Sequence, residues 1–155
     1  MPILRILVDG YSLLHAWPDL AAGRARHSEE ARTALVRTLS EYQSLLGTPI
    51  TVFFDGQGRK PTVSKEAGES VEVIFSKSGQ TADSLIERAA YRFKDYGQVL
   101  VITDDFTERD VVIGFGGLAS GCDTFIAQVD AAFDQARLDR VHHNRRENER
   151  YRRGR

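Results

Sequence analysis

The sequence has little cysteine and no long apolar run. Among 155 residues Cys122 is the one cysteine, and no apolar stretch approaches the roughly 20 residues of a membrane-spanning helix. We therefore expect neither a disulfide framework nor a membrane segment, and the lack of an apolar leader predicts a reducing cytoplasm. No histidine or basic residue next to Cys122 would activate it, so we expect a buried apolar side chain rather than a nucleophile.

Several familiar site motifs are also missing. The four histidines have no zinc-like spacing, and the glycine-rich segment at 114–121 matches neither GxGxxG nor GxxxxGK[ST]. This segment is predicted to form a tight turn. Asp9 is followed by Gly10 and Tyr11 rather than by a second acid two residues later. That pattern argues against a phosphohydrolase of the haloacid dehalogenase type, which otherwise also begins with an Asp after its first strand.

The composition suits one domain with a basic end. A chain of 155 residues that is 41% hydrophobic can bury a sufficient core, and it is short for two domains. The formal net charge of −1 hides an asymmetry, because the tail from Arg140 onward has seven arginines against two glutamates. We therefore predict a domain at 1–139 and an arginine-rich tail at 140–155. The tail suits either polyanion binding or a solvated helical end.

Apolar patterning predicts strands that alternate with helices. Ser28 and Gly47 are expected to cap a long helix between them, and Thr81 to cap another that carries Asp83 in its first turn. A polar stretch at 56–68, with Lys60 and Lys65, reads as an exposed loop. Strands are predicted at 3–8, 51–54, 71–75 and 98–103, with a short helix around 111–113 and a final amphipathic helix through 125–136. This order predicts an α/β fold, a three-layer α/β/α sandwich with a mostly parallel central sheet.

Acidic residues gather where strands end or helices begin. Asp9, Asp55 and the pair Asp104 and Asp105 each follow an apolar strand, and Asp83 opens a helix. The carboxyl ends of neighbouring parallel strands meet at one edge of the sheet, where α/β proteins bind ligands. Any one of these aspartates can equally be a helix cap. Together they predict a site for a hard divalent cation and metal-dependent phosphoester chemistry.

Four collinear segments resemble a known family. They are LVDGYSLLHAW at 7–17, VFFDG at 52–56, VIFSKSGQTADSLIER at 73–88 and VITDD at 101–105. Together with IGFGGLASG at 113–121 they look like the YacP-like NYN domains, a branch of the PIN-like nucleases, over nearly the whole chain to about Arg137. The KxGxTADxxIER block is the most specific segment.

The resemblance implies a PIN-like fold and a Mg²⁺- or Mn²⁺-dependent endoribonuclease, in some members acting on mRNA at the ribosome. By position it implies catalytic and metal-binding roles for Asp9, Asp83 and Asp105, with Asp55 and Asp104 as supporting metal ligands. The predicted RNA contacts are Ser12, Lys77, Arg88, Arg145 and Arg146.

The chain departs from the family pattern at four positions. Ser12 replaces the usual Asn after DGY, Asp104 replaces the Ser of a TSD motif, and Ala119 and Gly121 stand where an Arg and a Ser are common. These changes keep a second hypothesis open, an RNA- or ribosome-binding module with the nuclease fold and little or no catalysis.

Overall fold

The molecule alternates strands and helices as the sequence predicts. It is described here from a computed structural model, which covers residues 2–20, 22–23, 25, 28–56 and 71–154. The predicted loop lies outside these residues from position 57 onward, as do Lys60 and Lys65. The strands are β1 (Ile3–Asp9), β2 (Ile50–Phe54), β3 (Glu72–Phe75), β4 (Gln98–Ile102) and β5 (Leu118–Ser120). The helices are α1 (Gly10–Ala16), α2 (Glu29–Leu46), α3 (Ala82–Phe93), α4 (Phe106–Gly114) and α5 (Cys122–Arg153).

The strands form one parallel sheet in the order β3-β2-β1-β4-β5. Because β1 lies in the middle and every strand runs the same way, the carboxyl ends of all five share one edge. The expectation of a simple turn at 114–121 was wrong in part, since this segment contains β5, which pairs with β4 from Leu100 and Leu118 onward. A three-residue strand between glycines is too short to show an alternating pattern.

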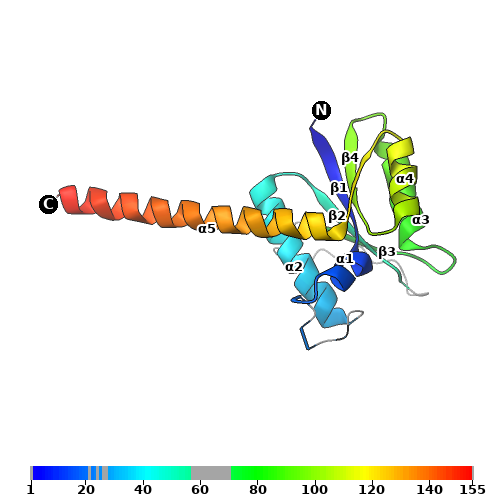
Figure 1. Cartoon of the computed structure of the whole chain (residues 1–155), viewed down its shortest axis with the longest axis horizontal. Coiled ribbons are helices and arrows are strands. Elements are labelled where there is room, and N and C mark those ends of the chain that lie inside the picture. The colour runs from blue at the N-terminus through cyan, green and yellow to red at the C-terminus, as the bar shows by residue number, and fades with distance from the viewer. Residues whose placement is uncertain (1, 21, 24, 26–27, 57–70, 155) are drawn as a thin grey trace.

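Helices cover both faces of the sheet, which confirms the three-layer sandwich (Figure 1). Ile6 and Val8 of β1 point into a core shared with α1, α2 and α5. Leu7, between them, points to the opposite face, where it packs with residues of α3 and α4. Successive strand residues alternate between faces, so an uninterrupted apolar strand supplies both cores.

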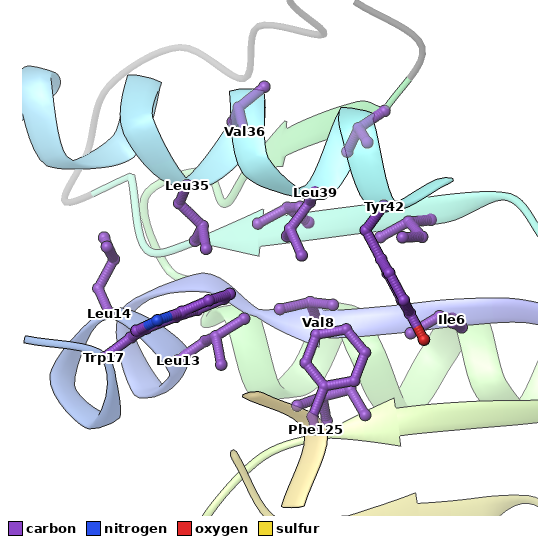
Figure 2. Close-up of a cluster of buried hydrophobic side chains, with 14 of the residues drawn as sticks. Ile6, Val8, Leu13, Leu14, Trp17, Leu35, Val36, Leu39, Tyr42 and Phe125 are labelled. Carbon is purple, nitrogen blue, oxygen red and sulfur yellow. The ribbon is translucent and has the colours of Figure 1, made fainter. Parts of the chain in front are cut away.

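The larger core combines aliphatic side chains with several aromatic rings (Figure 2). Tyr42 of α2 meets Phe125 of α5 edge to face, with ring centroids 5.6 Å apart. Trp17, which follows α1, is 7% exposed, so its ring is buried among apolar side chains. Cys122 is fully buried, and burial raises the pKa of its thiol to about 12, as expected for a packing residue.

Side-chain caps fix the helix boundaries that the sequence predicts. The Ser28 hydroxyl accepts a hydrogen bond from Ala31 N at 3.2 Å, and Gly47 ends the same helix with a positive φ of 82°. The sequence did not predict α1. Its seven residues begin directly after β1, where Asp9 caps the helix by accepting from Ser12 N.

Helix α5 crosses the predicted boundary between domain and tail without a break. Its 32 residues correspond to a length of about 48 Å, and its arginine-rich half projects away from the body in Figure 1. The division at residue 140 therefore falls within one helix. No helix in the described part of the chain is both long enough and apolar enough to span a membrane.

Replacing Gly10 with alanine is expected to destabilise the fold by about 1–3 kcal/mol through overpacking. A Cβ at Gly10 would lie 2.3 Å from Cε1 of Phe54, a buried ring that is flanked by Tyr11 and Phe75. Gly114→Ala is the matched control, because nothing lies within 4 Å of the added Cβ. Urea unfolding of both variants measures the difference, and equal midpoints would contradict the close packing.

Candidate metal centre

Three carboxylates meet at the carboxyl edge of the sheet. Oxygens of Asp9, Asp83 and Glu108 all lie within 4.8 Å of one another. Asp9 is the last residue of the central strand β1, whereas Asp83 and Glu108 lie in the first turns of α3 and α4. The positive ends of these two helix dipoles, together with the start of α1, reduce the repulsion among the three acids.

Glu108 is the most constrained member of this group. It is 1% exposed, and its Oε2 accepts a hydrogen bond from the Thr103 hydroxyl at 3.1 Å. Its other oxygen, Oε1, is buried and has no hydrogen-bond partner within the described residues. An unpartnered buried carboxylate oxygen is costly, so the arrangement favours a proton or a cation at this position.

Burial and crowding raise the pKa of two of the acids. Desolvation, followed by the nearby Asp83, raises the pKa of Glu108 to about 9. Desolvation also raises the pKa of Asp9 to about 7, with a further contribution from Asp83. Below these pH values the two carboxyl groups hold protons, which a divalent cation would displace.

The donor set fits a hard divalent cation. All three side chains offer carboxylate oxygens, which Mg²⁺ and Mn²⁺ prefer, and no sulfur or imidazole ligand joins them among the described residues. The unpartnered Oε1 of Glu108 supplies one free ligand atom. Mg²⁺ usually keeps several waters, so three protein ligands leave room for water and substrate.

The other predicted acids occupy supporting positions. Asp55 Oδ1 accepts a hydrogen bond from Ala82 N at 2.7 Å, which holds the first turn of α3 and hence Asp83. Asp105 caps α4, where its Oδ1 accepts from Thr107 N at 2.9 Å and from Glu108 N at 3.4 Å. The structure thus brings two of the three predicted catalytic acids together, Asp9 and Asp83, and places Asp105 at the start of the helix that bears Glu108.

Sequence reasoning missed Glu108. It lies in the run FTERD, which looks like an exposed helix start. One signal was available, because Glu108 and Val112 are four residues apart and are the two buried residues of α4. An acidic residue four positions before a buried apolar residue lies on the same inner face of the helix, so its carboxylate is a candidate for burial.

Of the five predicted RNA contacts, Ser12 lies at the acids, where its backbone N donates to Asp9 Oδ1 at 3.4 Å, and the other four are spread over the surface. Lys77 is exposed in the β3–α3 loop and lines a hollow of about 410 Å³ with Asp55 and Thr81. Arg88 is exposed on α3 and lines a separate pocket, together with Arg5 and Arg92. The remaining predicted contacts in the tail, Arg145 and Arg146, are exposed on the distal part of α5.

Comparisons with known proteins identify the family. The family model of the YacP-like NYN domain matches residues 6–154. The chain belongs to the YacP-like NYN domain family. A relative from Bacillus subtilis (strain 168), named uncharacterized protein YacP, is 37% identical over 126 residues, which is 81% of this chain and 74% of the relative.

Solved structures agree with this assignment to the YacP-like NYN domains. The crystal structure of Rae1 (YacP) from Bacillus subtilis has a TM-score of 0.74 and 35% identity, covering 93% of this chain and 81% of that one. Its W164L mutant has a TM-score of 0.71 and 35% identity, covering 88% and 79%.

Three of the positions at which the sequence is expected to depart from the family pattern contact one another. The Ser12 hydroxyl accepts a hydrogen bond from Asp104 N at 3.2 Å, and Asp104 Oδ1 accepts from Cys122 N at 2.9 Å and from Arg109 Nη2 at 3.2 Å. Gly121 lies beside the same guanidinium, since a Cβ there would be 2.8 Å from Nη2. These contacts connect α1, the turn between β4 and α4, α4 itself and the start of α5. The fourth departure, Ala119, lies in β5 opposite Val101.

The metal-free protein is expected to lose stability as the pH rises from about 5 to 9. The folded state holds the Glu108 proton up to a pKa of about 9, whereas the unfolded carboxyl loses it near 4.5. For each extra proton that the folded state binds, the free energy of unfolding therefore falls by up to about 1.4 kcal/mol for every pH unit of increase. Glu108→Gln cannot ionise and should flatten this decline.

Melting temperatures in EDTA across this range measure the effect, with Asp110→Asn, an exposed acid on the same helix, as the control. Addition of Mn²⁺ at pH 8 should raise the wild-type melting temperature and leave Glu108→Gln little changed. If the melting temperatures of wild type and Glu108→Gln fall equally with pH, ionisation of Glu108 is not the cause of the lost stability.

Proposed function

We propose that this protein is a Mg²⁺- or Mn²⁺-dependent endoribonuclease whose metal is held by Asp9, Asp83 and Glu108. The observation that carries the proposal is a cluster of three carboxylates within 4.8 Å of one another, in which Glu108 is buried and its Oε1 has no hydrogen-bond partner among the described residues. Membership of the NYN family adds support, because NYN domains are in general nucleases. An RNA phosphodiester is the substrate that this family relation favours.

The chain's own residues organise the reaction site. The Thr103 hydroxyl holds Oε2 of Glu108 and leaves Oε1 without a hydrogen-bond partner among the described residues. Asp55 and Asp105 fix the starts of α3 and α4, so Asp83 and Glu108 keep their positions relative to Asp9. A bound Mg²⁺ or Mn²⁺ ion would supply an activated water and stabilise charge on the phosphate during in-line attack.

The proposed ligand set differs from the one suggested by the sequence. Asp105 uses Oδ1 for two backbone N–H groups at the start of α4, so we assign it to positioning Glu108. Asp104 is likewise engaged, by Cys122 N and Arg109. Asp55 is engaged by Ala82 N. These three aspartates support the centre from the surrounding helix ends.

Asp9→Asn and Glu108→Gln are each expected to lower metal-dependent RNA cleavage by about 100-fold or more, because each removes a charged metal ligand. Asp105→Asn should retain most activity, since Asn is as good an N-cap as Asp, whereas Asp105→Ala should lose the cap and part of the activity. The measurement is cleavage of single-stranded RNA and of translated mRNA, with Mg²⁺ or Mn²⁺ titrated.

Loss of all activity in Asp105→Asn would show that Asp105 binds the metal directly, as the family resemblance implies. RNA binding by the wild type without cleavage at any metal concentration would instead assign the chain as a binding module with a nuclease fold. A wild type that neither binds metal nor cleaves RNA would contradict the proposal.

We further propose that α5 binds RNA, including ribosomal RNA when the substrate is mRNA on the ribosome. Arg145 and Arg146 lie on the projecting half of this helix, where exposed arginines can reach phosphates that the body does not approach. Lys77 and Arg88 offer further phosphate contacts on the body. Ser12 already accepts a hydrogen bond from Asp104 N, so any RNA contact must share its hydroxyl.

Replacing both Arg145 and Arg146 with alanine should weaken RNA and ribosome binding and reduce its salt dependence. The slope of log K against log salt should fall in magnitude by about 0.7 for each phosphate that the variant no longer neutralises. Alanine preserves helicity, so the change reports charge. Arg137→Ala is the control, because Arg137 pairs with Asp134 nearer the body. Unchanged slopes for the double variant would contradict a role for the tail.

A further inference from the structure

An exposed aromatic ring lies in the same helical turn as Glu108, a member of the candidate metal centre. Phe106 is the first residue of α4, two positions before Glu108, and it is 73% exposed. The guanidinium of Arg109 covers one face of the ring, with Cζ 4.6 Å from the ring centroid. The exposed fraction shows that the rest of the ring is open to solvent, on the outer side of the turn whose inner side carries the buried Glu108.

Arg109 is held in place behind this ring. Its Nε donates to the carbonyl oxygen of Thr103 at 2.8 Å, and its Nη2 donates to Asp104 Oδ1 at 3.2 Å. Gly121 provides the space, because a Cβ there would lie 2.8 Å from Nη2. Asp104 thus fixes this guanidinium, and Gly121 leaves room for it.

A second aromatic and cation pair on the surface lacks this support. Lys94 Nζ lies 4.1 Å from the ring centroid of Tyr91 on α3, with the same spacing of three residues. Within the described residues, Lys94 makes no hydrogen bond or ion pair that fixes its ammonium group. Single exposed aromatics are ordinary on protein surfaces, so the anchored cation distinguishes Phe106.

We infer that Phe106, backed by Arg109, is a nucleobase-stacking site for the RNA strand that enters the metal centre. An aromatic face binds any base by stacking, and a fixed cation behind it keeps the ring in position for the base. The inference rests on the proposed function, since it takes RNA as the ligand of the neighbouring centre. It adds a contact that holds a nucleotide next to the scissile phosphate without reading sequence.

The test compares Phe106→Ala and Phe106→Trp with Tyr91→Ala, the matched exposed aromatic on α3. Binding of single-stranded RNA oligonucleotides is measured in the full-length Asp9→Asn protein, which is expected not to cleave them. Cleavage is measured in the wild-type background. Phe106→Ala should weaken binding by about 5- to 150-fold, the effect of one base stack, whereas Phe106→Trp should restore it and Tyr91→Ala should change nothing.

Abasic nucleotides placed one position at a time identify the stacked base. One abasic position should weaken binding to the Phe106-containing protein and have little further effect in Phe106→Ala, because both changes remove the same stacking interaction. An abasic position that weakens binding equally in the two proteins, or equal affinity of the two for intact RNA, would overturn the inference.

The outcomes also separate this inference from the proposed function. Normal cleavage by Phe106→Ala at every substrate concentration would overturn the stacking site and leave the nuclease intact. Phe106-dependent RNA binding without metal-dependent cleavage in the wild-type background would support the stacking site and contradict the nuclease. Absence of RNA binding by a protein with Phe106 would overturn both.

Discussion

A buried carboxylate with one unpartnered oxygen is the constraint on which the site depends. Glu108 cannot reach water, its Oε2 is held by Thr103, and its Oε1 has no hydrogen-bond partner among the described residues. Its carboxylate lies within 4.8 Å of those of Asp9 and Asp83. Without a proton or a cation such a group destabilises the fold. The positions of β1, α3 and α4 keep this group in place, so the architecture maintains a local strain that a divalent cation would relieve.

The acids around this centre divide into two roles. Asp9, Asp83 and Glu108 converge, whereas Asp55 and Asp105 accept hydrogen bonds from the first turns of the helices that carry Asp83 and Glu108. Asp104 does the same for the start of α5 through Cys122 N, and it also fixes Arg109. An aspartate after a strand thus fixes the start of a helix, which is α4 for Asp105, α3 for Asp55 and α5 for Asp104, and through these helices the geometry of the site.

Much of the fold could be predicted from the sequence because its signals are local. Apolar runs, the caps Ser28 and Thr81 and the stop at Gly47 are each read within a few residues. The short strand β5 and the seven-residue helix α1 were missed, because their form depends on pairing with β4 and on packing against the sheet. At the site, Asp9 and Asp83 were found from their places at strand and helix ends. Choosing between Asp105 and Glu108 required knowing which side of α4 faces inward, and that depends on the tertiary structure.

Anomalous diffraction from crystals soaked in Mn²⁺ would test the central claim most directly, because it locates the ion without reference to activity. The account predicts a peak between the carboxylates of Asp9, Asp83 and Glu108, with Oε1 of Glu108 among the ligands. A peak bound instead by Asp104 and Asp105, or no peak in this region at saturating Mn²⁺, would contradict it.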